Sequence, residues 1–176
     1  MHDLSLHLLD LLENSIAAGA SIVSIELHVD PDADRLNLVV DDNGRGLATQ
    51  PDEAVNPFYT TKSHKHVGLG LSLLQAAAEQ SGGSMTIGPS PELGGVRVDV
   101  RMSLSHIDRP PIGNLAATIS TMVSAHPKVE FRGRFGWEDQ QVDFNTWRDL
   151  DLEDPIAASM EAYRILQASF KCPEYL

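Results

Sequence analysis

The sequence has few of the features that mark secreted, membrane-spanning or nucleic-acid-binding proteins. Its single cysteine, Cys172, cannot form an intrachain disulfide, which fits a reducing compartment. It contains no run of about 18 apolar residues, so no transmembrane helix is expected. The first residues lack the basic segment and small-residue cleavage site of a signal peptide. We therefore expect a cytoplasmic protein with no membrane partner.

Positive charge is also scarce. The chain has 13 Lys and Arg against 25 Asp and Glu, a net charge of −12. Binding a nucleic-acid backbone requires clustered Lys and Arg, so nucleic acid is not an expected partner. A hydrophobic fraction of 42% with 22% charged residues is typical of a globular protein. At 176 residues the chain can form one domain, or one domain with a small appendage.

Residues 4–18 are expected to form an amphipathic helix that ends at Gly19. Asp10 and Asn14 are four residues apart on this helix and share a face, whereas Glu13 points about 100° away from Asn14. Two alternating strands follow, over residues 21–29 and 36–42. By the two-residue period, Asp42 falls on the apolar side of the second strand, where an acid needs an explanation.

The rest of the chain divides into three parts. Residues 49–67 read as irregular, and residues 68–83 as a glycine-rich helix start and a helix, followed by two strands up to about residue 104. The prolines at 110–111 mark the predicted boundary between a domain over residues 1–106 and an extension over residues 107–176. In the extension we expect a helix over about 113–125, a hairpin, and a last helix that Asp154 caps and Pro155 begins.

Four stretches in this order resemble the nucleotide-binding motifs of the GHKL superfamily of ATPases: DNA gyrase, heat-shock chaperones, sensor histidine kinases and MutL. "DLLENSIAAGA" is similar to the asparagine motif, and "DDNGRG" matches D-x-G-x-G. "NPFYTTK" resembles the segment before the sensor-kinase lid, and "VGLGLSLLQAAAEQSGG" resembles the second glycine motif. The resemblance covers about residues 4–104 and implies an α+β fold, a two-layer α/β sandwich of the histidine-kinase-like ATPase (Bergerat) type.

The resemblance also implies a site for ATP and Mg²⁺. Asn14 would offer its side-chain oxygen to Mg²⁺, a hard cation that prefers oxygen ligands, and Asp42 would accept the adenine amine. Asp10 would be the catalytic acid–base residue. Glycines allow close backbone approach, and N–H groups at a helix N-terminus favour phosphate. The implied nucleotide-binding residues are Asn14, Asp42, Gly44, Gly46, Lys62, Val67, Gly68, Leu69, Gly70 and Leu71.

A purely structural role is open for several of these residues. Asn14 could be hydrogen-bonded within the core, Asp42 could simply begin a turn, and Lys62 could be an ordinary surface lysine. His64 and His66 lack a third nearby ligand, so we expect no metal there. The stretch "HIDRPPI" mimics the phosphoacceptor motif of sensor kinases at His106, but the two prolines obstruct the long helix that such a histidine needs.

The sequence departs from the family pattern at three positions. Asp10 stands where gyrase-like and MutL-like members have a glutamate as general base. His66 stands where sensor kinases have a further glycine, and Val96 replaces a common threonine whose hydroxyl supports the adenine-binding acid. A carboxylate one methylene shorter makes efficient hydrolysis less expected, whereas phosphoryl transfer to a side chain depends more on positioning.

We therefore expect a stand-alone ATP- and Mg²⁺-binding protein, a regulatory kinase or weak ATPase that acts on a protein partner. The alternative is a non-catalytic module that senses ATP, and a third interpretation is a fragment of a MutL-like repair ATPase. A homodimer is left open. Residues 107–176 contain no motif that assigns them a role.

Overall fold

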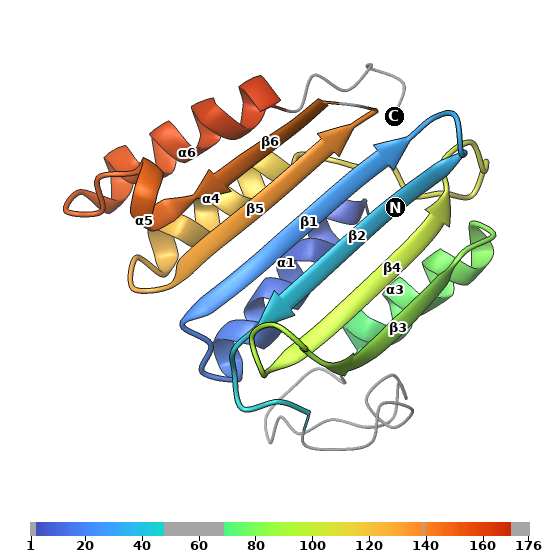
Figure 1. Ribbon diagram of the computed structural model, residues 1–176, viewed down its shortest axis with the longest axis horizontal. Helices are drawn as coiled ribbons and strands as arrows, with labels where there is room; N and C mark the ends of the chain where they lie inside the picture. The colour runs from blue at the N-terminus through green and yellow to red at the C-terminus, as the bar shows by residue number, and fades with distance from the viewer. Residues whose placement is uncertain (1–2, 48–68, 139, 170–176) are drawn as a thin grey trace.

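The computed structural model describes residues 3–47, 69–138 and 140–169. One six-stranded sheet forms the centre of the fold, with the strand order β3-β4-β2-β1-β5-β6. Helices α1, α3 and α4 lie against one face of this sheet, which gives the two-layer α/β arrangement that the sequence predicted (Figure 1). The elements are α1 (Leu4–Ala17), β1 (Ile22–Asp30), β2 (Arg35–Asp42), α3 (Leu69–Gln80), β3 (Ser84–Pro89), β4 (Val96–Ser103), α4 (Leu115–Ala125), β5 (Glu130–Trp137), β6 (Gln140–Asn145), α5 (Thr146–Asp149) and α6 (Pro155–Ser169).

Helix α1 begins and ends where its sequence predicts. The Asp3 carboxylate accepts the backbone N–H of Leu6, which caps the first turn. The helix ends before Gly19, whose φ of 79° is the left-handed conformation that glycine adopts without strain. Four of its leucines are fully or almost fully buried against the sheet and α4, while Asp10 and Asn14 lie on the exposed side.

Strands β1 and β2 pair in antiparallel register and alternate as predicted. Every second residue faces the helices and is buried, as Val23 and Leu38 show, but burial stops alternating in the second half of β2, where Val39 and Asp41 on the other face are buried as well. Asp42 lies opposite Val23 on this apolar side, so the acid predicted to face the core does so. Its neighbour Asp41 points to the other face, where Arg97 lies 3.0 Å away and forms an ion pair with it.

The C-terminal extension continues the same sheet and the same core. The helix, the hairpin and the last helix predicted for it are present, and Asp154 caps α6 through the N–H groups of Ile156 and Ala157. Strand β5 pairs in parallel with β1, so the hairpin of β5 and β6 lies beside the first strand of the chain (Figure 1). The boundary at residue 106 remains a prediction, but the sheet is continuous across it.

The segment after the two prolines is tied to the start of α1. The N–H of Leu4 donates to the carbonyl of Pro111 at 2.9 Å, and the N–H of Ser5 donates to Ile112 at 3.0 Å. Gly113 has a φ of 74° and lies so close to the Asp3 carboxylate that a Cβ would be 2.5 Å from its Cγ. The extension therefore helps to position the helix that carries Asp10 and Asn14.

No helix in the described part of the chain is long and apolar enough to cross a lipid bilayer.

Candidate functional site

The carboxylate of Asp42, in the predicted site, is buried and accepts three hydrogen bonds. The residue is 5% exposed. Its Oδ1 accepts the N–H groups of Gly44 at 2.8 Å and Val96 at 3.1 Å, and its Oδ2 accepts the hydroxyl of Ser15 at 2.8 Å. A carboxylate only accepts hydrogen bonds, and its two oxygens have about four lone-pair positions. Three donors therefore hold the group in place and leave room for a further donor, such as an amine.

The backbone around Asp42 can approach it closely because two neighbouring residues are glycines. A Cβ at Gly44 would lie 2.8 Å from the Cβ of Ala18, closer than packed carbon atoms come. A Cβ at Gly95 would collide with Oδ1 and the backbone oxygen of Asp42. Gly46 has a φ of 80°, a left-handed conformation that completes the turn. The predicted motif glycines are thus needed for the local backbone geometry.

The hydroxyl that Val96 lacks is replaced from another element. Ser15, which follows Asn14 on α1, is 4% exposed and donates to Asp42 across the interface between helix and sheet. Val96 still contributes through its backbone N–H. Despite the departure at position 96, Asp42 therefore has a hydroxyl partner.

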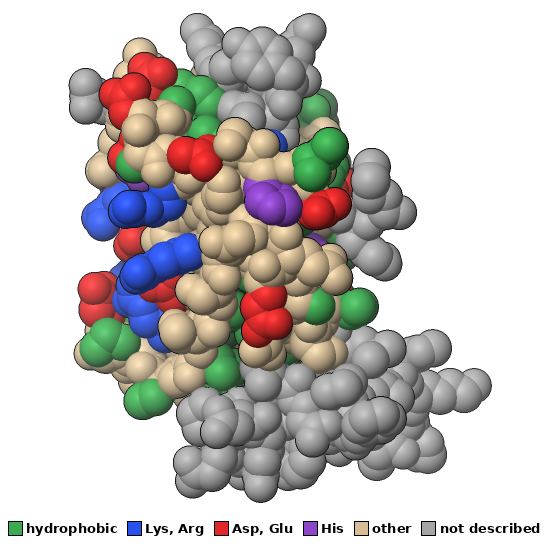
Figure 2. Space-filling model, turned by 90° about the vertical axis from the view of Figure 1, so that its right-hand side faces the viewer, with side chains coloured by type: hydrophobic (Ala, Val, Ile, Leu, Met, Phe, Trp, Pro, Cys, Tyr) green, Lys and Arg blue, Asp and Glu red, His purple; other side chains and the backbone are tan. Residues whose placement is uncertain are grey.

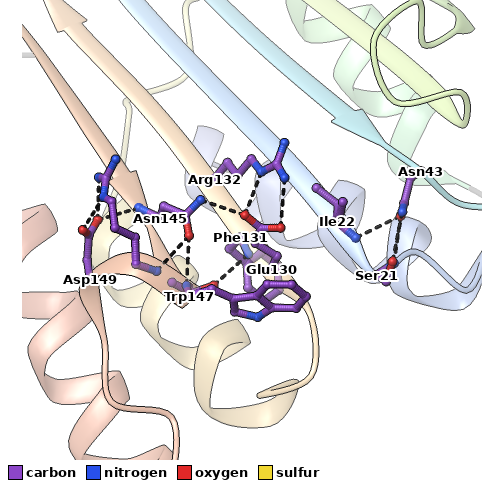
Figure 3. Close-up of polar contacts among 11 residues, drawn as sticks. Ser21, Ile22, Asn43, Glu130, Phe131, Arg132, Asn145, Trp147 and Asp149 are labelled. Carbon is purple, nitrogen blue, oxygen red and sulfur yellow. Dashed lines mark hydrogen bonds and ion pairs between the residues drawn. The ribbon is translucent and has the colours of Figure 1, made fainter.

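Asn43 fastens this turn to the beginning of β1. Its side-chain oxygen accepts the N–H groups of Ser21 at 2.8 Å and Ile22 at 2.9 Å, and its amide donates to the Ser21 hydroxyl (Figure 3). The N–H of Arg45 donates to the carbonyl of Ala18 at the end of α1. The "DDNGRG" turn is therefore bound both to the end of α1 and to the start of β1.

Asp10 and Asn14 lie exposed on one face of α1. Within the described residues, neither side chain has a polar partner in the structure. The first turn of α3 reaches this face, since a Cβ on Gly70 would be 3.0 Å from Oδ2 of Asp10. The structure thus brings the second glycine motif to the asparagine motif, which is 60 residues earlier in the chain.

The remaining predicted residues are only partly covered by the structure. Leu71 is half-buried and packs against the core, and Leu69 begins α3. Lys62, Val67 and Gly68 lie outside the described residues, as do His64 and His66. Their predicted roles therefore stay predictions.

His106 lies in a loop rather than in a helix, and its Nδ1 accepts the N–H of Asp108 at 3.2 Å. This arrangement differs from the helical setting that a sensor-kinase phosphoacceptor would need.

The donor set of the site fits a hard cation held by few protein ligands. The described residues contain no group of three or more His, Cys, Asp or Glu able to hold a metal by themselves. Asn14 and Asp10 offer side-chain oxygens that have no polar partner in the described part of the chain, and both lie on one face of α1. Mg²⁺ commonly takes one or two protein ligands plus phosphate oxygens and waters. These residues are therefore compatible with Mg²⁺ bound together with a nucleotide.

The fold, and the approach of the described parts of three of the motifs to α1, are those of a class of ATPases. Residues 2–106 match the family described as histidine kinase-, DNA gyrase B- and HSP90-like ATPase. This protein belongs to that family. The match does not include residues 107–176.

Sequence similarity is to sensor histidine kinases. The chain is 28% identical over 108 residues to a putative NtrY-like sensor histidine kinase of Rickettsia conorii, and this covers 61% of the chain. It is 36% identical over 83 residues, or 46% of the chain, to the sensor histidine kinase ZraS of Salmonella typhimurium. These regions are 18% and 17% of the two relatives, so the chain spans less than a fifth of either of them.

Fold similarity extends over more of the chain. The N-terminal domain of a DNA repair protein matches 90% of this chain and 57% of its own, with a TM-score of 0.58 and 15% identity. The Aquifex aeolicus MutL ATPase domain complexed with ADP matches 92% of this chain and 70% of its own, with a TM-score of 0.51 and 15% identity. Because both matches must include most of the extension, the fold shared with these structures is larger than the family domain.

Sequence reasoning missed three residues around the turn that Asp42 begins: Ser15 and Gly95, which bond to Asp42, and Asn43, which ties the turn to β1. Their signals were present, since Ser15 follows Asn14, Asn43 lies inside "DDNGRG", and Gly95 belongs to the glycine pair before β4. None of these signals shows which atom Asp42 contacts, because that depends on how α1 and β4 pack beside β2.

Proposed function

We propose that this protein binds ATP with Mg²⁺ and transfers the γ-phosphoryl group to a side chain of a protein partner, as a regulatory kinase. The observation that carries the proposal is the buried Asp42 carboxylate, held by three donors and bonded to the residue next to Asn14. Membership of the ATPase family and the sensor-kinase relatives support it. Slow hydrolysis of ATP is the accompanying reaction when no acceptor is bound.

Asp42 would recognise adenine. Its free lone pair accepts a hydrogen bond from the exocyclic amine, whereas guanine presents a carbonyl oxygen at the same ring position, which cannot donate. A buried acceptor left without a donor is costly, so the site discriminates between the two bases. Gly44 and Gly46 let the base approach the backbone.

Asn14 would hold Mg²⁺ through its side-chain oxygen, with phosphate oxygens as the other main ligands. When bound, Mg²⁺ neutralises charge on the phosphates during transfer. The N-terminal turn of α3, with Gly70, would direct backbone N–H groups toward the phosphates. Lys62, Val67, Gly68, Leu69 and Leu71 remain in the predicted nucleotide-binding set.

Asp10 would act at the acceptor. In the transfer step the bond between the γ-phosphorus and the β,γ-bridging oxygen breaks, and a bond forms between that phosphorus and the acceptor atom. The acceptor's proton passes to the Asp10 carboxylate, and ADP leaves. In hydrolysis, a water molecule takes the place of the acceptor side chain and loses its proton to the same carboxylate.

The second candidate function is a module that senses ATP and catalyses nothing. The shorter side chain of Asp10 favours this sensing module, because its carboxylate reaches an attacking water less readily than that of a glutamate would. A third candidate is a MutL-like repair ATPase fragment, which the fold similarity favours and the net charge of −12 opposes.

The test is incubation of the full chain with γ-labelled ATP and candidate partner proteins, alongside calorimetry with ATP and Mg²⁺. Label on a partner, lost in Asp10→Asn and retained in Glu13→Gln, supports the kinase. Binding without transfer or phosphate release establishes the sensing module instead. Glu13 is a matched control because it is exposed on the same helix but points away from Asn14.

A further inference from the structure

The Asp42 carboxylate is held in place by neutral donors. They are two backbone N–H groups and the hydroxyl of Ser15. Arg97 of β4 pairs instead with Asp41 on the other face of the sheet. In the view from the side of β3 and α3, Lys and Arg side chains gather mainly on one flank (Figure 2). The direction of the Asp42 carboxylate therefore depends on where the backbone of its turn lies.

Asn43 fixes the position of that backbone. It lies between Asp42 and Gly44, whose N–H donates to the Asp42 carboxylate at 2.8 Å. The side-chain oxygen of Asn43 accepts the N–H groups of Ser21 and Ile22, and its own N–H donates to the carbonyl of Ile22 at 3.2 Å. A shift of Asn43 would move Gly44 and change the direction of its bond to Asp42.

Ser21 joins this turn to the extension. Its N–H and its hydroxyl are bonded to Asn43, at 2.8 and 2.9 Å. Its carbonyl accepts the N–H of Glu130, the first residue of β5, at 2.9 Å. Figure 3 shows Asn43, Ser21 and Glu130 on neighbouring segments, where β2 ends and β1 and β5 begin. Asn43 and Ser21 therefore link Asp42 to β5 through hydrogen bonds.

The start of β5 is a firm anchor for this link. Glu130 is 6% exposed and Phe131 is fully buried. The Glu130 carboxylate accepts two hydrogen bonds from Arg132 and one from Asn145, and the N–H of Phe131 donates to the buried hydroxyl of Thr146 at 3.0 Å. The N–H that the Ser21 carbonyl accepts is therefore held in position by β6 and α5.

By itself, the bond between Glu130 and Ser21 is an ordinary bond between parallel strands. Its place in the fold gives it a further role. The acceptor, Ser21, precedes β1, and its other polar groups are bonded to the residue beside Asp42. At the opposite end of the same two strands, the N–H of Glu138 donates to the carbonyl of Val29 at 3.0 Å, far from the Asp42 turn.

We propose that the extension takes part in adenine recognition: the start of β5 positions the Asp42 turn through Ser21 and Asn43, which are positioning residues. The inference rests on the proposed function only in taking adenine as the group that Asp42 binds. Residues 107–176, which include β5, lie outside the family match. Coupling between two sites is reciprocal, so bound adenine should in turn stabilise the bond between Glu130 and Ser21.

The first test compares ATP with GTP by calorimetry on the full chain with Mg²⁺. Asn43→Ala removes the side-chain bonds to Ser21 and Ile22, so the preference for ATP over GTP should fall roughly tenfold. Asn43→Asp keeps an oxygen that accepts both N–H groups and should retain most of the preference. A side chain that only stabilised the fold would change the affinity for both nucleotides by the same factor.

The second test follows the exchange of backbone amide hydrogens by NMR. In the wild type, ATP should slow exchange at Glu130 roughly tenfold more than at Glu138. The Glu138 amide is the matched control, because its bond to Val29 lies at the other end of the same two strands. In Asn43→Ala at saturating ATP, the two amides should be slowed by equal factors.

An unchanged preference for ATP in Asn43→Ala overturns the proposal and leaves phosphoryl transfer standing, and so does equal slowing at Glu130 and Glu138 in the wild type. If both tests give the expected results but no partner is labelled, the positioning role is supported and the proposed kinase is refuted. A wild type that binds no ATP refutes both. If Asn43→Ala does not fold, amide exchange in the wild type still decides.

Discussion

The hydroxyl of Ser15 on α1 lies 2.8 Å from Oδ2 of Asp42 at the end of β2, and both residues are buried. This bond joins the asparagine motif to the D-x-G-x-G motif directly. It also supplies the hydroxyl that is absent at Val96. Ser15 thus orients the acid without itself facing solvent.

Replacing Ser15 tests whether that orientation matters. Ser15→Ala should weaken ATP binding roughly tenfold, because a hydrogen bond to a charged group contributes about 1.5–3 kcal/mol. Ser15→Thr should recover part of the loss, since threonine keeps the hydroxyl. Calorimetry measures both affinities. Ser159→Ala is the control, because the hydroxyl of Ser159 on α6 donates to the backbone carbonyl of Ser120 on α4 and contacts neither Asp42 nor α1 through this bond. An equal loss of affinity in this variant would show that only general stability had changed.

The two residues proposed to bind adenine and Mg²⁺, Asp42 and Asn14, give a second prediction. Asp42→Asn exchanges an acceptor oxygen for an amide that can point its donors at the adenine amine, so ATP affinity should fall by about a hundredfold. Asn14→Ala should weaken ATP binding in the presence of Mg²⁺ much more than binding of adenosine, which carries no phosphate. Wild-type affinity for ATP in both variants would mean that the motifs are only a turn and a helix surface.

Gly95 and Gly88 form a matched pair for a third prediction. A Cβ on Gly95 collides with Asp42, so Gly95→Ala should displace the acid, reduce ATP binding and destabilise the fold by about 1–3 kcal/mol. A Cβ on Gly88 meets nothing within 4 Å, so Gly88→Ala should leave both properties unchanged. Urea unfolding and calorimetry measure the two effects. Similar behaviour of the two variants would contradict the close approach at Gly95.

Much of the fold could be predicted from the sequence because periodicity reports which face of an element is buried. The alternation that placed Asp42 on the apolar side of β2 is correct, and so are the caps at Gly19 and Asp154. Periodicity does not report which elements are neighbours. The parallel pairing of β5 with β1 depends on long-range contacts, and the sequence alone showed only a hairpin in an appendage.

The residues of the candidate site could likewise be predicted only in part from the sequence. Motif order predicted Asp42, Gly44 and Gly70 as site residues. In the structure Asp42 is bonded to Ser15 of α1, and Gly70 lies close to Asp10 of the same helix. The hydroxyl of Ser15 was not predicted, because a serine beside an asparagine on a helix points to its partner only when the helix is packed on the sheet.

Glu130 gives a prediction on pH dependence. Two hydrogen bonds from Arg132, and a third from Asn145, lower the pKa of the Glu130 carboxyl although burial opposes the shift (Figure 3). Because the pKa is lower in the folded state, the ionised carboxylate stabilises the fold at pH values above 4.5, the ordinary pKa of the group. This stabilisation is lost as the pH falls from 4.5 through the lowered pKa. Glu130→Gln should therefore lower the free energy of unfolding by about 1–2 kcal/mol at neutral pH.

The difference in the free energy of unfolding between Glu130→Gln and the wild type should shrink as the pH falls below 4.5. Denaturant unfolding at several pH values measures it. Glu26→Gln is the control, because Glu26 and its partner Arg134 are 3.5 Å apart and both are well exposed, so their ion pair contributes little. A difference for Glu130→Gln that stays constant with pH would show that packing rather than charge is responsible.

Truncation after residue 106 tests whether the family domain folds without the extension. The cut removes β5, which pairs with β1, and α4, which packs against α1. It also removes the backbone acceptors Pro111 and Ile112 at the start of α1. The fragment would expose a buried strand edge and the apolar side of α1, so it should aggregate or lack a cooperative thermal transition.

The matched truncation ends after residue 169 and keeps every described element. It should unfold cooperatively near the temperature of the full chain, measured by circular dichroism, and bind ATP with the same affinity. A fragment of residues 1–106 that unfolded cooperatively and bound ATP like the full chain would contradict the expectation. The extension would then be an independent unit attached to the sheet, and the positioning of Asp10 and Asn14 would not depend on it.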